Sequence, residues 1–138
     1  MPETIQATVN LIDRFLHCKK VQALSDFQLI GITAMFIACK FHELYPPVIS
    51  DFIQVTYNSF TKKQLLQMEV EMMIALDFDF NCTLPQTLLE SYNLAIGLCH
   101  DTQVIYSACY YIDLSLLSAE FLKFPVQLTV ICALTIAL

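Results

Sequence analysis

Two charged residues lie in stretches of the sequence that are otherwise apolar, and a charge in an apolar setting is a first sign of a binding site. Lys40 follows an uncharged run over 27–39. Glu69 lies in the segment 61–77, where a spacing of about 100° per residue places it inside an apolar arc and opposite the polar face. A carboxylate on an apolar stripe is costly unless a partner satisfies it, so both residues are candidates for polar recognition.

The same two residues also have explanations within a fold. A lysine in the last turn of a helix interacts favourably with the helix dipole and extends its amine to water. An internal ion pair satisfies a glutamate on an apolar stripe, and Lys40 is the obvious partner of Glu69. Spacing alone does not separate an internal pair from a pair that also contacts another protein.

Three phenylalanines, Phe41, Phe78 and Phe80, stand next to these charges. Phe78 and Phe80 alternate with Asp77 and Asp79 where the helix is expected to end. Aromatic residues at helical spacing are usually part of a core. The alternative is an exposed docking surface in which aromatic side chains surround a charged pair, which is the anatomy of an interface hot spot. The sequence leaves both alternatives open.

The residue types that carry catalysis are not grouped in this sequence. There is no glycine-rich phosphate loop, no nucleophile with a nearby base and no pair of carboxylates away from the surface. The six cysteines have no CxxC spacing, which favours reduced thiols in the core. Cys39 and His42 are three residues apart and make at most half of a metal site. We therefore expect neither an enzyme nor a bound metal or cofactor.

The composition bounds the architecture and the partners. The 138 residues are 57% apolar and only 14% charged, against roughly 25% charged residues in an average soluble domain. Such a chain can bury one domain-sized core or two small ones, and part of its apolar surface should face something outside the chain. The net charge is −6 and the seven basic residues are scattered, which argues against nucleic acid as a partner.

No membrane partner is expected either. The longest uncharged runs, 27–39 and 124–138, are shorter than the roughly 20 residues that span a bilayer. The second run reaches the last residue, which leaves a truncated membrane segment as an alternative. Neither a signal peptide nor a lipidation motif is visible at Met1.

The pattern of the chain predicts helices throughout. Only two glycines occur, and no stretch alternates between apolar and polar residues for long enough to make a strand. Ser25 with Gln28 and Thr61 with Gln64 have the spacing of capping boxes. The expected helices cover residues 4–17, 25–43, 48–55, 61–77, 84–98, 101–119 and 125–138.

Three segments together resemble the cyclin family, and most closely its mitotic A and B types. They are VNLIDRFL at 9–16, FQLIGITAMFIACKFHELYPP at 27–47 and TKKQLLQMEVEMMIALDFDF at 61–80. The three occur in the family's order and at similar spacing through residues 1–80. From residue 81 onwards the similarity is one of pattern only.

The resemblance implies an all-α fold of cyclin boxes, which are helical bundles. Residues 1–80 would be the N-terminal box from its second to its fifth helix, without the first helix. Residues 81–138 would be the start of the C-terminal box, with about three helices and without the last two. The chain is then expected to be a fragment or a truncated gene model of marginal stability, with apolar faces that lack their partners.

The resemblance also implies a function. Cyclins bind a cyclin-dependent protein kinase and move its C-helix to the active position, so the expected role is that of a non-catalytic regulatory subunit. Lys40 would hold backbone carbonyl groups at the end of that helix, with Glu69 as its acidic companion. Phe41, Phe78 and Phe80 match the apolar positions that receive an isoleucine of the same helix.

The sequence departs from the family pattern beside this site. Where mitotic cyclins usually have two acidic residues, this chain has His42 and Glu43, so Glu43 stays on the expected kinase surface while His42 lowers the negative charge and makes docking mildly pH-sensitive. The first helix of the family carries an arginine that pairs with the aspartate at Asp13. It also carries most of a patch for substrate or inhibitor motifs, of which Phe27 and Gln28 are retained.

Three functional hypotheses follow from the resemblance. The leading one is a kinase-activating subunit in cell-cycle control, located in the nucleus or the cytoplasm. The second is a cyclin-box scaffold that binds other proteins, against which the segment KFHELYPP favours kinase binding. The third is an inactive decoy that retains kinase affinity without activating the kinase.

Overall fold

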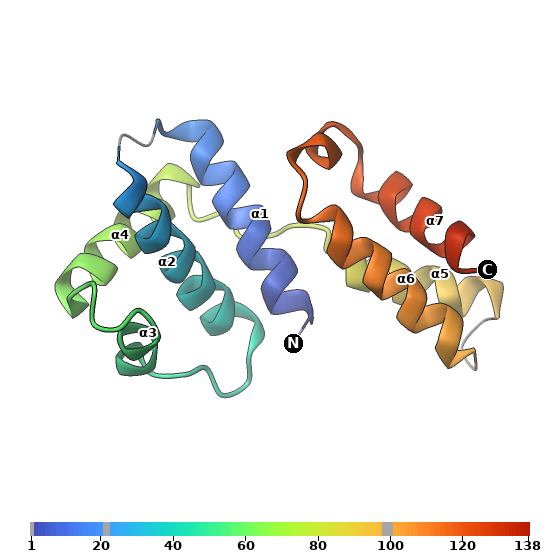
Figure 1. The fold of residues 1–138 in the computed structure, drawn as a ribbon, viewed down its shortest axis with the longest axis horizontal. Coiled ribbons are helices and arrows are strands. Elements are labelled where there is room, and N and C mark those ends of the chain that lie inside the picture. The colour runs from blue at the N-terminus through green and yellow to red at the C-terminus, as the bar shows by residue number, and fades with distance from the viewer. Residues whose placement is uncertain (1, 21–22, 98–100) are drawn as a thin grey trace. The chain divides into compact units, whose positions relative to one another are not determined.

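The computed structural model describes residues 2–20, 23–97 and 101–138. Within these ranges the regular elements are all helices and there is no strand, which confirms the predicted all-α class (Figure 1). The elements are α1 (Pro2–Cys18), α2 (Leu24–His42), α3 (Ile49–Val55), α4 (Lys62–Ala75), α5 (Pro85–Ile96), α6 (Thr102–Ser115), the 3-10 helix η1 (Ala119–Lys123) and α7 (Val126–Ala137).

The chain divides into two compact units, Met1–Cys82 and Thr83–Leu138. The first unit holds α1 to α4 and the second holds α5, α6, η1 and α7. All of the residues singled out for docking belong to the first unit.

The first unit is built around α2, which lies between α1 and α4 (Figure 1). Ile30, Ala34 and Ala38 are spaced four residues apart on α2 and are almost completely buried. Towards α3, the rings of Phe36 and Phe52 pack edge to face, with their centroids 5.2 Å apart. The uncharged run thus forms a helix that packs against three others, as its sequence predicts.

The start of α4 follows the capping rule that its sequence predicts. The Gln64 backbone N–H donates to the Thr61 hydroxyl over 3.3 Å, and the Thr61 backbone N–H donates to the Gln64 side-chain oxygen over 2.9 Å. These two bonds satisfy two donors that a helix start leaves open. They fix the register of α4, and with it the positions of Leu65, Met72 and Glu69 on the buried face.

The start of α2 differs from its prediction. The N-cap is Ala23 and the helix begins at Leu24, so Ser25 lies within the first turn and is not the cap. The predicted capping box is therefore wrong. The spacing of Ser25 and Gln28 fits a capping box, but the observed N-cap lies two residues nearer the N-terminus than this pattern indicates.

The predicted helix over 101–119 is shorter than expected. It ends at Ser115 and is followed by η1, whose N-cap is Ser118. The Ser118 hydroxyl accepts a hydrogen bond from the Glu120 N–H over 3.4 Å. Serine side chains that bond to nearby backbone groups compete with a continuing α-helix, which accounts for the early end.

The second unit has its own core between α5, α6 and α7, and Figure 1 shows α6 and α7 side by side. Gly97 ends α5 in the left-handed conformation, with a φ of 75°, as a helix C-cap favours. Leu89, Ile112 and Val130 are fully buried in this core. An apolar groove of about 410 Å³ remains open along α6, η1 and α7, with Phe121 and Leu128 in its lining.

The last helix, α7, carries most of the second uncharged run but is only 12 residues long. Across the part of the chain that the structure describes, no helix has both the length and the apolar character needed to cross a bilayer.

The cysteines do not all lie in the core. Cys39 is buried, whereas Cys18 and Cys132 are exposed, so the expectation of core thiols is wrong for these two. Cys18 stands between His17 and Lys19 at the end of α1, and Cys132 is one of the residues that line the open groove along α7. The described cysteines are free, and burial raises the pKa of the Cys39, Cys82 and Cys109 thiols. Cys99 lies outside the described residues.

Candidate protein-docking site

Lys40 and Glu69 form the ion pair that the sequence predicts. The Lys40 amine, in the last turns of α2, donates to Oε1 of Glu69 in the middle of α4. The Glu69 side chain is only 6% exposed, whereas that of Lys40 is 43% exposed. The Lys40 amine also lies 4.3 Å from the centroid of the Phe36 ring, within the range of a cation–π contact.

This unequal burial has a chemical consequence. A lysine amine has three N–H donors, and the bond to Glu69 uses one of them. The buried carboxylate therefore holds a half-exposed amine in a fixed place while donors remain for other acceptors. Such an amine is pre-organised to bind carbonyl or carboxylate oxygens of another molecule.

The aromatic cluster, defined as Phe41, Phe78 and Phe80, lies at the surface beside this pair. Phe41 and Phe78 are exposed and Phe80 is half-buried. The Phe80 ring lies between the other two, with centroids 6.1 Å from Phe41 and 6.4 Å from Phe78. For Phe41 and Phe78 the structure therefore favours the docking alternative over the core alternative.

The chain places Phe78 in the cluster by a strained turn. After α4, Asp77 and Phe78 adopt left-handed conformations with φ of 52° and 55°. These angles are unfavourable for residues other than glycine by roughly 1 kcal/mol each. The Phe78 N–H donates to the Met73 carbonyl over 2.9 Å, and Asp79 forms an ion pair with Arg14 at 3.2 Å. Strain of this kind is typical of functional sites.

Glu43 has a partner that sequence analysis missed. The Thr4 hydroxyl, near the start of α1, donates to the Glu43 carboxylate at the C-cap of α2. This hydrogen bond is the largest of the influences that hold the pKa of Glu43 below its usual range. The two residues are 39 positions apart, and no local pattern links them. The His42 ring packs edge to face on Phe41, with centroids 5.1 Å apart.

Phe27 and Gln28 lie apart from this site. Both are exposed in the first turns of α2, whereas Lys40 is near the end of the same helix. At 1.5 Å per residue, the 13 positions between Phe27 and Lys40 correspond to about 20 Å along the helix. Any docking at Phe27 and Gln28 is therefore separate from docking at Lys40.

Three side chains on one face of α1 have oxygen atoms that accept no hydrogen bond from the described residues. Burial raises the pKa of Asp13, and among the described residues no ion pair or hydrogen bond satisfies its carboxylate. Buried side-chain oxygens of Glu3 and Asn10, on the same side of α1, also lack a hydrogen-bond partner. Sequence analysis singled out Asp13 only through the family resemblance.

Comparison with known proteins identifies the family. Residues 1–81 match the family described as Cyclin, N-terminal domain. The chain is 38% identical to human Cyclin-A1 over 136 residues, and this alignment covers 98% of this chain and 29% of Cyclin-A1. It is 38% identical over 133 residues to G2/mitotic-specific cyclin-2 of Medicago sativa, covering 96% of this chain and 40% of the relative. The chain therefore belongs to the cyclin family, as its sequence motifs predict.

The fold agrees with a solved member of the family. The X-ray structure of a viral cyclin from herpesvirus saimiri matches 99% of this chain and 60% of that chain, with a TM-score of 0.88 and 22% sequence identity. The helical fold is thus that of cyclins. Cyclins are regulatory subunits and generally not catalytic. The chain spans less than half of the length of the first curated relatives it matches.

Proposed function

We propose that this chain is a cyclin-type regulatory subunit that binds and activates a cyclin-dependent serine/threonine protein kinase. The observation that carries the proposal is the half-exposed Lys40 amine, which a buried Glu69 holds beside the aromatic cluster. The family membership supplies the class of partner. The division into an N-terminal box over 1–80 and the start of a C-terminal box over 81–138 remains part of this proposal.

The chemistry of the site fits the end of a partner helix. The last turn of any helix leaves backbone carbonyl groups without partners and carries the negative end of the helix dipole. A fixed lysine amine with spare donors is complementary to such an end. In the proposed complex Lys40 therefore binds the end of the kinase C-helix, and Glu69 keeps the amine in place.

The aromatic cluster would supply the apolar part of the contact. Exposed Phe41 and Phe78 and half-buried Phe80 can receive an aliphatic side chain of the C-helix, which by family resemblance is an isoleucine. A charged anchor next to a small aromatic pocket is how hot spots are usually built. Glu43 follows Phe41 by two positions, and its bond to Thr4 supports the end of α2.

Such contacts would act on the kinase through the position of its C-helix. In protein kinases a glutamate of this helix must reach a lysine of the active site before phosphoryl transfer can proceed. Binding that favours the inward position shifts the kinase population towards its active state. The chain itself needs no catalytic group for this role.

The direct test is capture of purified cyclin-dependent kinases by the chain, with phosphorylation of a protein substrate measured in the bound fraction. The test variant is Lys40→Met with Glu69→Gln, because it removes the amine without leaving a buried carboxylate alone. The control is Lys123→Met, which removes a lysine of the second unit. Loss of capture and activity in the double variant alone supports the proposal, and capture that survives in it refutes this site.

Two alternatives are distinguished by the same experiment. A folded chain that captures no kinase would be a scaffold for other proteins. Capture without phosphorylation would make the chain a decoy. We further propose a nuclear or cytoplasmic location.

Phe27 and Gln28 are the proposed remnant of a patch for substrate or inhibitor motifs. Phe27→Ala should therefore weaken substrate phosphorylation without weakening kinase capture.

A further inference from the structure

Helix α4 carries an apolar row on its exposed side. Leu66, Val70 and Ile74 are spaced four residues apart, so they lie one above another along the helix. They are 39%, 51% and 66% exposed. The core takes its contacts from the neighbouring face, where Leu65 and Met72 are buried. The row is therefore apolar surface that the fold leaves open to solvent.

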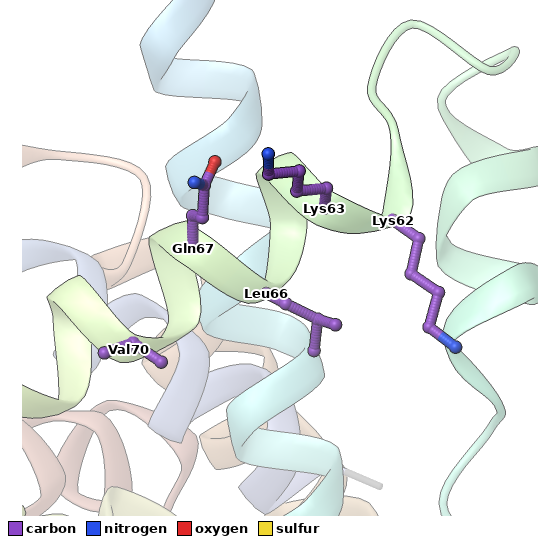
Figure 2. Close-up of a pocket in the computed structure, with 5 residues that line it drawn as sticks. All are labelled: Lys62, Lys63, Leu66, Gln67 and Val70. Carbon is purple, nitrogen blue, oxygen red and sulfur yellow. The ribbon is translucent and has the colours of Figure 1, made fainter.

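Part of this row lines an open groove of about 610 Å³, which we call the α4 groove. Leu66 and Val70 supply the apolar part of the lining, and Lys62, Lys63 and Gln67 complete it. Figure 2 shows Lys62 and Leu66 extending from α4 in one direction and Lys63 and Gln67 extending in another. The groove therefore combines aliphatic side chains with two positive charges at one end.

The two lysines of the groove have no acidic partner in the described part of the chain, whereas Arg14, Lys19 and Lys40 each pair with a carboxylate. They occupy the first two positions of α4, at the positive end of the helix dipole, where a positive charge is unfavourable. This end of the groove is therefore complementary to an acidic group from another molecule.

The exposed face of α6, in the second unit, has the opposite charge. Tyr106 and Tyr110 are 71% and 62% exposed, and Asp113 is exposed on the same side of the helix. The Asp113 carboxylate has no ion-pair partner among the described residues. It lies in the last turn of α6, at the negative end of the helix dipole, where a negative charge is unfavourable. This face therefore combines exposed aromatic rings with a carboxylate that lacks a cation.

The two surfaces also match in the spacing of their residues. Along α6 the two tyrosines and Asp113 follow one another at intervals of four and then three residues. Along α4 the same intervals lead backwards from Val70 to Leu66 and then to Lys63. Both rows measure about 10 Å, at 1.5 Å per residue. In an antiparallel pair of helices the carboxylate therefore faces the lysines while the tyrosine rings cover Leu66 and Val70.

We propose that the exposed face of α6 in one copy of the chain docks into the α4 groove of a second copy. The contact places tyrosine rings, a residue type that hot spots favour, on aliphatic side chains. It also pairs charges that each copy by itself holds at the unfavourable end of a helix. Because the two surfaces differ, the contact is head to tail and association can continue beyond two copies. The proposal does not depend on kinase binding, since both surfaces belong to this chain.

Sedimentation equilibrium of the full chain at two salt concentrations tests this contact. We expect the average mass to rise with protein concentration, and to rise less at high salt because the paired charges are screened. The first variant is Asp113→Lys, and the second combines Lys62→Glu with Lys63→Glu. Each places like charges across the contact and should associate at least about tenfold more weakly. A third variant, Tyr106→Ser with Tyr110→Ser, removes the aromatic part and should weaken association by a similar factor.

A mixture of the first two variants gives the most specific result. The α6 face of Asp113→Lys is complementary to the groove of the lysine variant, so the mixture should associate about as strongly as the original chain. Both variants keep a net negative charge, so a general attraction between them does not explain a recovery. Unfolding does not explain a loss in either, because lysine is favourable in the last turn of a helix and glutamate in the first. The unfolding midpoint in urea should therefore not fall.

The controls make the same charge changes at exposed positions outside both surfaces. Glu120→Lys is matched to Asp113→Lys, and Lys20→Glu with Lys123→Glu is matched to the lysine variant. Both controls should stay within about threefold of the original chain. A chain that is still a monomer at about 1 mM would overturn the proposal. Association that survives in both charge variants would overturn it too, since the contact would then lie on another surface, and so would a mixture that does not recover.

Discussion

Replacing Lys40 by methionine tests whether the buried Glu69 depends on its partner. Methionine keeps most of the length and apolar contact of the lysine stem but has no charge and no donor. The variant leaves a carboxylate that is 6% exposed without the amine that satisfies it. Removing one partner of a fully buried pair costs about 3–5 kcal/mol, and exposed pairs contribute about 0.2–1 kcal/mol.

The expected loss lies between these limits. The Lys40 side chain is 43% exposed, so water can reach the carboxylate from the amine side and soften the penalty. We therefore expect the Lys40→Met variant to lose about 2 kcal/mol of stability in the first unit. The double variant with Glu69→Gln should recover most of that loss, because a neutral amide costs much less to bury than a carboxylate.

Hydrogen exchange followed by mass spectrometry is the suitable assay, because it reports each unit separately and does not assume that the whole chain unfolds in one step. A loss of about 2 kcal/mol makes the most protected amides of α2 and α4 exchange roughly 30-fold faster, at a factor of ten per 1.4 kcal/mol. Exchange at the wild-type rate in Lys40→Met would refute the reasoning. A double variant as unstable as the single one would refute it too.

Three further predictions concern the supports of the site. Asp13→Asn removes a carboxyl group whose pKa is raised by burial. Because the folded wild-type chain holds this proton more tightly than the unfolded chain, its stability should fall as the pH rises from 3.8 through the raised pKa. Urea unfolding of the variant should lack this pH dependence. Thr4→Val removes the hydrogen bond that contributes most to lowering the pKa of Glu43, so the pKa of Glu43 in an NMR titration should rise towards 4.5. In the wild-type chain this bond stabilises the fold above pH 4.5, and its contribution is lost as the pH falls through the lowered pKa. An unchanged titration of Glu43 in the variant would contradict this reasoning. Thr61→Ala should cost about 1 kcal/mol in urea unfolding through loss of the α4 cap, whereas Thr61→Ser should retain most of it.

Local rules predicted the elements that depend on local contacts. The Thr61 and Gln64 capping box is made within four residues, so its pattern alone placed the start of α4 correctly. The same rule failed at Ser25, where the helix begins at Leu24. The spacing argument that set Glu69 on an apolar stripe, with Lys40 as its partner, was confirmed because burial of that stripe follows from helix geometry.

Features that depend on distant contacts escaped sequence analysis. The bond from Thr4 to Glu43 joins residues whose only connection is the packing of α1 on α2. Leu66 and Val70 of α4 are exposed although they are apolar, and a periodic pattern alone does not tell how wide a stripe the neighbouring helices will cover. The left-handed turn at Asp77 and Phe78 contains no glycine, so the sequence did not indicate it. The roles of the site residues in kinase binding come from the family resemblance and stay predictions.

Acetylation would have different consequences at different lysines of this protein, because some of them pair with a carboxylate and others do not. At Lys62 or Lys63 an acetyl group would remove a charge that pairs with no acidic residue of the described chain, so it would leave the fold intact. At Lys40 it would abandon a buried carboxylate and loosen the packing of α2 on α4. An acetyltransferase or an amine-reactive reagent would therefore leave the fold unchanged at Lys62 and Lys63. At Lys40 the same modification would break the ion pair on which the docking site depends.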